Sequence, residues 1–206
     1  MQTVAIVDYG LANIRSVVNA VECFDAKVLV AARGQDLAAA DKIILPGVGS
    51  FDAGMRGLRA RGHEAALADA VREGGKPFLG VCLGMQFLFE GSDEGVEPGL
   101  AWMKGRVRGF PVTPGGPKVP HIGWSEVEAT GRGRLYQAMP AVFDAYFVHS
   151  YYIEKLGEAE TCATGLCRHG LTFVASLETG SISACQFHPE KSQMTGMKIF
   201  ENFLAL

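Results

Sequence analysis

The sequence has little of what marks several large classes of protein. Five cysteines in 206 residues, without regular spacing, are too few for a disulfide-stabilised scaffold. The formal net charge is only −3, so no strong charge excess indicates nucleic acid or an anionic membrane as a partner. No apolar run reaches the ~18 residues of a membrane-spanning helix. Disulfide-rich, nucleic-acid-binding and membrane-spanning proteins are therefore not expected.

The first ten residues, MQTVAIVDYG, lack the basic region and small-residue cleavage site of a signal peptide, and we interpret them as a strand. Together with the odd number of cysteines, this predicts a cytoplasmic protein. Hydrophobic residues make up 48% of the chain, enough for a large core. At ~100–200 residues per domain, we expect residues 1–206 to form one domain.

In the first half of the chain, short apolar runs alternate with stretches of helical spacing. We predict strands at residues 3–7, 27–30, 42–45 and 78–81. We predict helices at residues 13–24, 35–40, 50–55, 63–72 and 85–89. This order is typical of an α/β fold with a mostly parallel central sheet and helices on both faces.

The second half reads as short β-like runs between turn residues, which predicts an antiparallel or mixed extension of the sheet. These runs lie at residues 100–108, 125–128, 145–149, 159–167, 172–177 and 182–187. A helix over residues 191–206 closes the chain. The Pro- and Gly-rich residues 110–120 are interpreted as a long loop within one domain, because the β pattern continues across them.

The strongest local signal for chemistry is Gly80-Val81-Cys82-Leu83-Gly84, between a predicted strand and a helical run. This is the pattern of a nucleophile elbow with cysteine in place of serine. Its glycines allow a sharp turn, which would present the thiol at a helix N-terminus where a thiolate is favoured. The alternative, a small buried hydrophobic cysteine, is less compatible with both glycines and the strand–turn–helix context.

A cysteine nucleophile needs a base, and His188 follows the predicted strand at residues 182–187. Glu190 lies two residues further on, so in an extended chain both side chains point to the same face. The carboxylate would then orient the imidazole, the third role of a catalytic triad. Taken alone, a His-x-Glu pattern is common and also fits a solvated surface pair.

The turn Pro46-Gly47-Val48-Gly49 follows a predicted strand and precedes a predicted helix. It does not match a dinucleotide-binding fingerprint, because Asp52 occupies the place of the third glycine. Backbone N–H groups of Val48 and Gly49, together with that of Leu83, are predicted to hold a developing oxyanion. A plain strand–helix turn is the alternative.

Metal binding is weakly indicated. Cys162, Cys167 and His169 have loose spacing and lack a fourth ligand, so we predict no metal site and no cofactor. His63-Glu64 lacks the second histidine of a zincin motif. His149 is interpreted as structural.

Together, the motifs around Cys82, His188 and Pro46 resemble those of the class I, or triad, glutamine amidotransferases. Further motifs narrow the resemblance to the glutaminase subunits of imidazole glycerol phosphate synthases, which serve histidine biosynthesis. These motifs are Asp8-Tyr9-Gly10 with Asn13, Pro46-Gly-Val-Gly-Ser-Phe51, His121-Ile-Gly-Trp124, Tyr146-Phe-Val-His-Ser-Tyr151 and His188-Pro-Glu-Lys-Ser192. Two positions depart from the family pattern, with Ala12 where glycine is usual and Ser125 where asparagine is usual.

The resemblance implies the three-layer fold of that family and glutamine as the substrate. It assigns Cys82 as nucleophile, His188 as base and acid, and Glu190 as its orienting group. Gln86 and Glu94 would bind the polar groups of glutamine. The product would be glutamate and ammonia.

The resemblance also implies a partner, because released ammonia is mostly protonated at neutral pH and must reach an acceptor site on another polypeptide. That partner would be a β/α-barrel cyclase subunit, in a heterodimer whose glutaminase is nearly idle until the cyclase binds its substrate. We predict that Tyr9, Asn13, Trp124 and Lys191 contact this partner. Alternatives are a glutaminase serving another synthase, a standalone cysteine amidohydrolase, or a non-catalytic binding module on the same fold.

Overall fold

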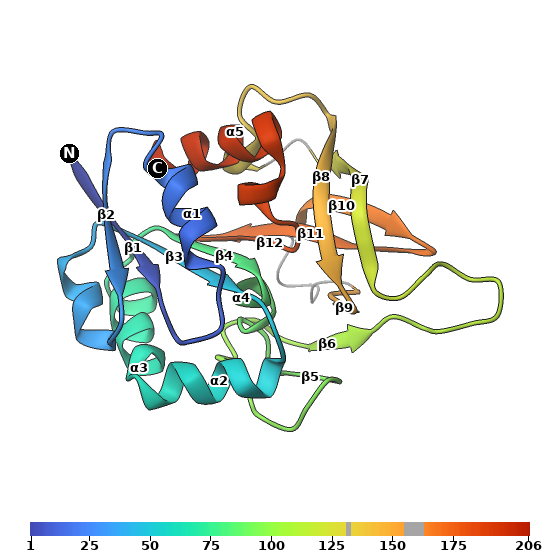
Figure 1. The fold of residues 1–206 in the computed structure, drawn as a ribbon, viewed down its shortest axis with the longest axis horizontal. Coiled ribbons are helices and arrows are strands. Elements are labelled where there is room, and N and C mark those ends of the chain that lie inside the picture. Colours follow the sequence, from blue (N-terminus) through green and yellow to red (C-terminus); the bar gives the residue numbers. More distant parts are fainter. Residues whose placement is uncertain (131–132, 155–162) are drawn as a thin grey trace.

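The computed structural model describes residues 1–130, 133–154 and 163–206. Its centre is a nine-stranded sheet in the order β2-β1-β3-β4-β12-β11-β10-β7-β8 (Figure 1). The first five strands in this order pair in parallel, and the other pairings are antiparallel. The predicted α/β fold with an antiparallel extension is confirmed.

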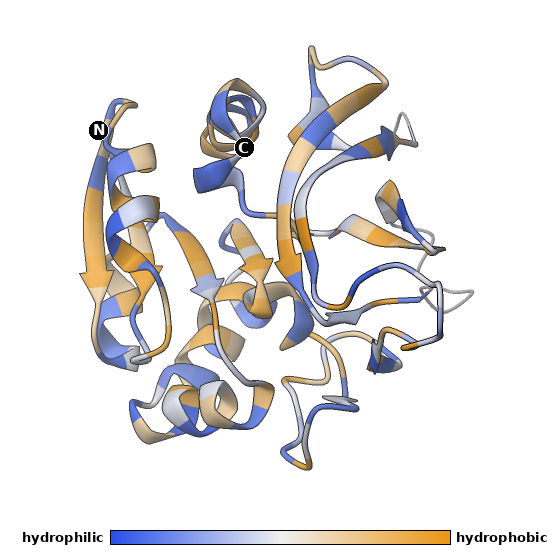
Figure 2. Cartoon of the chain, turned by 45° about the vertical axis from the view of Figure 1, so that its right-hand side comes forward, coloured by the Kyte–Doolittle hydropathy of each residue, from blue (hydrophilic) through white to orange (hydrophobic). Residues whose placement is uncertain are grey.

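The parallel half consists of strands that read in the sequence as apolar runs. Its inner strands are mostly buried, as expected for strands covered on both faces, whereas the edge strand is mostly half-buried or exposed. Hydrophobic residues accordingly colour much of these strands in Figure 2. The five parallel strands are β1 (Gln2–Val7), β2 (Ala26–Ala31), β3 (Lys42–Gly47), β4 (Phe78–Cys82) and β12 (Ile182–Cys185).

The antiparallel half completes the sheet beyond β12. It contains β11 (Leu171–Thr179), β10 (Ala163–His169), β7 (His121–Ala129) and β8 (Val142–His149). Residues 110–120 form neither helix nor strand, and β7 continues the same sheet after them. A smaller three-stranded sheet joins β5 (Gly91–Ser92), β6 (Arg106–Gly109) and β9 (Tyr151–Tyr152).

Helices cover both faces of the large sheet, because alternate strand residues point to opposite sides. On β1, Val4 and Ile6 join one hydrophobic core and Ala5 and Val7 the other. The first core also contains residues of α1 (Ile14–Val21) and α5 (Gln193–Leu204). The second contains residues of α2 (Phe51–Ala60), α3 (His63–Leu67) and α4 (Leu83–Gln86). The architecture therefore has three layers.

Short irregular helices complete the fold. These are 3-10 turns at η1 (Gly34–Ala39), η3 (Arg134–Tyr136) and η4 (Pro189–Lys191), and a π-helical turn at η2 (Ala68–Glu73) that continues α3. Among the described residues, no helix combines the length and the apolar character needed to cross a membrane.

Several predicted boundaries are wrong. The helix predicted at residues 85–89 starts earlier and is one turn long, since α4 begins directly after Cys82. Of the run at residues 100–108, only the end belongs to a strand, β6. The predicted strand at residues 159–167 lies partly outside the described residues, and its described part belongs to β10.

Candidate active site

Cys82 occupies a strained position at the turn between β4 and α4. Its φ is 53°, in the left-handed region that non-glycine residues rarely adopt. Such backbone strain costs about 1–3 kcal/mol and persists only where the surrounding structure enforces it. The turn is therefore a specific feature of this strand–helix junction.

The two glycines around Cys82 are required by close backbone contacts. A Cβ atom at Gly84 would lie 1.9 Å from the carbonyl oxygen of Leu45 on β3, well inside contact distance. A Cβ atom at Gly80 would lie 2.8 Å from the carbonyl oxygen of Gly84. The glycine spacing thus allows α4 to pack closely against β3 and supports the turn at Cys82.

His188 is brought to the same edge of the sheet by strand pairing. β12 pairs in parallel with β4, with Cys185 opposite Val81, so the carboxyl ends of the two strands meet. In open α/β sheets this edge is where ligands bind. Residues more than a hundred positions apart thereby come together.

Glu190 orients His188 through a short hydrogen bond. Nδ1 of His188 donates to Oε1 of Glu190 at 2.7 Å, and both side chains are buried. We predicted this contact from an extended chain. In the structure, Pro189–Lys191 form a 3-10 turn instead, and this turn brings the two side chains together. Nε2 of His188 has no hydrogen-bond partner among the described residues, which leaves it available for proton exchange.

The electrostatic surroundings favour the protonated form of His188. Burial by itself would lower the pKa of this imidazole, but the nearby charges of Cys82 and Glu190 and the hydrogen bond to Glu190 raise the pKa to about 10. The imidazolium form is therefore stabilised next to a group that can become a thiolate. This arrangement is suited to nucleophilic catalysis by a cysteine.

A cavity of about 390 Å³ opens beside Cys82. This volume falls within the ~300–1,000 Å³ range of small-molecule sites. Most of the residues predicted for catalysis, the oxyanion and glutamine binding line its wall, namely Val48, Gly49, Cys82, Leu83, Gln86 and Glu94. Lys191, which we predicted to contact a partner, lines it as well. His149 lines it as well, although the sequence indicated a structural role for this residue.

Gln86 is held by two acceptors. Its Nε2 atom donates to the Tyr151 carbonyl at 3.2 Å and to Oε1 of Gln186 at 3.0 Å. Gln186 in turn donates from Nε2 to the Sγ atom of Cys82 at 3.5 Å. Gln186 was not predicted from the sequence, although its position two residues before His188 places it on the same face of the chain.

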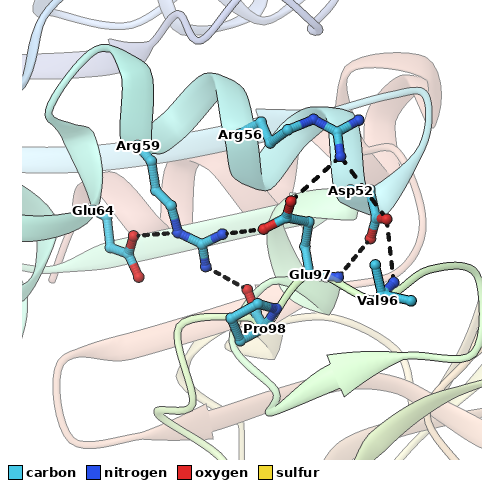
Figure 3. A network of polar contacts seen from close by, with 7 residues as sticks. All are labelled: Asp52, Arg56, Arg59, Glu64, Val96, Glu97 and Pro98. Atoms are coloured by element: carbon cyan, nitrogen blue, oxygen red, sulfur yellow. Dashed lines mark hydrogen bonds and ion pairs between the residues drawn. The ribbon is translucent and has the colours of Figure 1, made fainter.

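Glu94 is fixed by the start of helix α2, where its Oε2 accepts the N–H of Phe51 at 2.8 Å. The loop that follows Glu94 is tied to α2 by a polar network (Figure 3). Asp52 accepts the N–H groups of Val96 and Glu97 at 3.2 and 3.0 Å. Arg59 pairs with Glu97 at 2.6 Å. Because α2 follows the Pro46–Gly49 turn, one network supports both the turn and Glu94.

The predicted oxyanion donors are only partly available in this conformation. The N–H of Val48 donates to the carbonyl oxygen of Leu11 at 3.1 Å. Gly49 has a φ of 94°, a conformation that glycine adopts readily. For the Val48 N–H to bind an oxyanion, it would have to leave the Leu11 carbonyl.

The residues predicted to contact a partner are placed differently from one another. Asn13 is exposed and precedes α1. Tyr9 is only 2% exposed, and its ring packs edge-on against Phe87. Contact with a partner through the Tyr9 side chain therefore requires this side chain to leave the core, and the contact stays a prediction.

Trp124 and Lys191 meet at the Tyr146 side chain. Trp124 is 47% exposed and packs edge-on against the Tyr146 ring, with centroids 6.0 Å apart. The Lys191 ammonium lies 5.8 Å from the centre of the same ring, a cation–π geometry. We call these three residues the aromatic–lysine cluster. It leaves an exposed aromatic surface near the cavity that Lys191 lines.

A chain of histidines extends from the cavity to Ser125. Nδ1 of His149 donates to the Tyr151 carbonyl at 2.8 Å, so its Nε2 accepts from Nδ1 of His121 at 3.0 Å. Nε2 of His121 then accepts from the Ser125 hydroxyl at 2.8 Å. Burial lowers the pKa of His121 to about 4 and that of His149 to about 3, so both rings are neutral at pH 7.

The weak zinc motif does not assemble within the described residues. His169 stacks on His121, and burial raises the pKa of the Cys167 thiol to about 12. Cys162 lies outside the described residues. No group of three or more possible ligands is found in the part of the chain that the structure describes.

Comparison with known proteins places this site in a family. The model of the glutamine amidotransferase class-I family matches residues 5–206, and the chain therefore belongs to that family. Within it, the chain is 43% identical over 207 residues to the imidazole glycerol phosphate synthase subunit HisH of Nostoc punctiforme, covering 100% of this chain and 96% of that protein. It is 41% identical to HisH of Moorella thermoacetica, covering 98% and 94%. Its place in the family is thus among the HisH subunits.

Solved structures show the same fold at lower identity. The structure of PurLQS from Thermotoga maritima matches with a TM-score of 0.76 at 19% identity and covers 100% of this chain and 99% of that chain. The glutaminase domain of CTPS from Trypanosoma brucei matches with a TM-score of 0.67 at 19% identity, covering 100% and 93%. The family and the fold make this chain a glutamine amidotransferase.

The close contact at Gly84 predicts a strong effect of Gly84→Ala. The new methyl group would collide with the Leu45 carbonyl, and we expect a loss of at least about 3 kcal/mol in the free energy of unfolding. Gly109→Ala is the matched control, since a Cβ there meets only the Tyr151 ring at 3.6 Å. Equal denaturation midpoints for the two variants would contradict this account.

The raised pKa of His188 predicts that its ring stays protonated at pH 8, where an ordinary histidine with a pKa of about 6.5 is neutral. Its contribution to stability is then complete below about pH 6.5 and is lost as the pH approaches 10. NMR titration of the His188 ring measures this directly. Cys82→Ser should lower the midpoint, and a wild-type midpoint near 6.5 would refute the prediction.

Proposed function

We propose that this chain is the glutaminase subunit of an imidazole glycerol phosphate synthase and that Cys82, His188 and Glu190 carry its reaction. The observation that carries the proposal is a strained Cys82 that lines a cavity, at the same edge of the sheet as a buried His188–Glu190 pair. Similarity to HisH subunits over nearly the whole chain supports the choice of synthase.

The reaction begins with attack of the Cys82 thiolate on the side-chain amide carbon of glutamine. The C–S bond forms, and the amide oxygen takes the negative charge. His188, protonated at Nε2, gives this proton to the departing nitrogen, the C–N bond breaks, and ammonia leaves a glutamyl thioester. His188 then removes a proton from water as water attacks the thioester, and glutamate is released with recovery of the thiolate.

Backbone N–H groups stabilise the charge on the amide oxygen in both steps. Leu83 follows the nucleophile directly, and Val48 and Gly49 line the cavity from the neighbouring strand end. We propose all three as oxyanion donors. Since the Val48 N–H is bound to the Leu11 carbonyl, the proposed site is completed only when this hydrogen bond breaks. That requirement fits an enzyme with little activity in isolation.

Gln86 and Glu94 are proposed to bind the polar groups of glutamine. Both line the cavity, and both are held in place, Gln86 by Tyr151 and Gln186 and Glu94 by Phe51. A carboxylate at Glu94 suits the ammonium group of the substrate, because opposite charges attract strongly in a partly buried site.

A HisH subunit works with a partner subunit, and we propose a β/α-barrel cyclase that consumes the ammonia. The heterodimer would use it to form imidazole glycerol phosphate and the aminoimidazole carboxamide ribotide. Asn13 and the aromatic–lysine cluster, which contains Trp124 and Lys191, are the proposed contacts. Residues 1–206 are proposed to act as one glutamine amidotransferase domain, because the large sheet contains strands from both halves of the chain.

Replacing Cys82 with serine should abolish glutamate release. A hydroxyl in this site is a far weaker nucleophile, and we expect a loss of at least about a thousandfold in kcat for the complex with the cyclase. Glutamate release measured with saturating glutamine tests this. Cys23→Ser, which alters an exposed cysteine, is the control. Activity of Cys82→Ser within tenfold of the wild type would reject Cys82 as nucleophile.

Truncation of Trp124 should weaken assembly with the cyclase. Exposed aromatic residues at the centre of interfaces often contribute about 2 kcal/mol or more, so Trp124→Ala is expected to raise the Kd roughly thirtyfold. Titration calorimetry measures this Kd. Val142→Ala, at the other end of the β7–β8 pair, removes an exposed apolar side chain as a control. An unchanged Kd for Trp124→Ala would place the interface elsewhere.

A further inference from the structure

Gln186 continues β12 and approaches the nucleophile from the same face as His188. Its backbone N–H donates to the Ala175 carbonyl at 2.8 Å, which extends the pairing with β11. The intervening Phe187 points to the opposite side and belongs to a hydrophobic core. Gln186 is completely buried. An amide side chain in such a place must satisfy its polar atoms within the protein.

Both ends of the Gln186 side chain are used. Oε1 accepts the N–H of Gln86 at 3.0 Å, and Nε2 donates to Sγ of Cys82 at 3.5 Å. Gln86 is fixed in turn by the Tyr151 carbonyl. Because its oxygen is taken by a donor, the amide group of Gln186 is oriented with its N–H toward the sulfur. Hydrogen bonds therefore run from the Tyr151 carbonyl through Gln86 and Gln186 to the sulfur of Cys82.

A thiolate at Cys82 needs such donors. Cys82 is only 6% exposed, and a buried anion without hydrogen bonds is strongly disfavoured relative to its neutral form. His188 compensates the charge, and it also has to transfer its proton during the reaction. A donor that keeps its proton would stabilise the thiolate in every protonation state of the histidine.

We propose that Gln186 is a catalytic residue that donates an amide N–H to the Cys82 thiolate and that Gln86 positions it. This inference rests on the proposed function, in which Cys82 is the nucleophile. Gln186 transfers no proton. When the C–S bond forms, the sulfur loses its charge and the contact weakens. When the C–S bond of the thioester intermediate breaks, the sulfur regains its electron pair, and Gln186 stabilises the departing thiolate.

Three substitutions separate this role from packing. Gln186→Met preserves the size of the side chain and removes the donor. Gln186→Glu retains an acceptor for Gln86 and places a negative charge beside the sulfur. Gln186→Asn keeps a donor but withdraws it by one methylene group. Gln2→Met is the matched control, since Gln2 donates to the Leu204 carbonyl near the end of α5.

The measurement is the rate of iodoacetamide alkylation against pH, read by mass spectrometry on the peptide that contains Cys82. With Gln186→Met we expect the midpoint of the profile to rise by about one pH unit, which corresponds to a tenfold loss of thiolate. The rise should be larger with Gln186→Glu and smaller with Gln186→Asn. Glutamate release by the complex with the cyclase should fall about tenfold at pH 7 for Gln186→Met and recover partly at higher pH.

Wild-type midpoints for Gln186→Met and Gln186→Glu, in variants that unfold at the wild-type temperature, would overturn the proposal. If Gln186→Met does not fold, the profile of Gln186→Asn decides, and an unshifted midpoint again overturns it. Glutamate release by Cys82→Ser tests the proposed function separately. If Cys82→Ser is still active, Cys82 is not the nucleophile and the proposed function fails. If Cys82→Ser is inactive but the alkylation midpoints of the Gln186 variants do not shift, only the proposed role of Gln186 fails.

Discussion

The parallel pairing of β4 with β12 is the constraint on which the site depends. It joins Val81 to Cys185 across more than a hundred residues, so Cys82 and His188 leave the sheet at the same edge. A strained turn at Cys82 follows β4, and a 3-10 turn that brings Glu190 to His188 follows β12. Gln186 uses the same pairing, because it lies on the β12 extension and faces the sulfur.

Around Cys82, most of the proposed site is held by close packing and hydrogen bonds, but one proposed oxyanion donor is bound elsewhere. The close approach of Gly84 to Leu45 holds the elbow, and the Asp52–Glu97 network holds the loop behind Glu94. By contrast, the N–H of Val48 is bound to Leu11, outside the proposed oxyanion site. Breaking this one hydrogen bond would complete the proposed oxyanion site and turn on glutamine hydrolysis. Such control suits a subunit whose ammonia is useful only next to a site that consumes it.

Much of the fold could be predicted because the parallel strands are apolar runs and the helices between them are amphipathic. The Cys82 elbow could also be predicted, since both glycines and the nucleophile lie within the five residues Gly80–Gly84. Contacts that depend on tertiary packing could not be predicted from the sequence. Nothing local shows that Gln186 reaches Cys82, that His149 lines the cavity, or that Tyr9 fills the core beside Phe87. Helix α4 was misplaced because the sharp turn, and not its apolar pattern, determines where it starts.

The most direct test of the central claim is glutamate release from glutamine by the chain alone, with the cyclase, and with the cyclase and its ribotide substrate. We expect slow release by the isolated chain and a large increase only when both additions are present. Rapid hydrolysis by the isolated chain, or no increase with the complete mixture while Cys82 still reacts with a glutamine analogue, would contradict the central claim. The first result would indicate a standalone amidohydrolase, and the second would indicate a different partner.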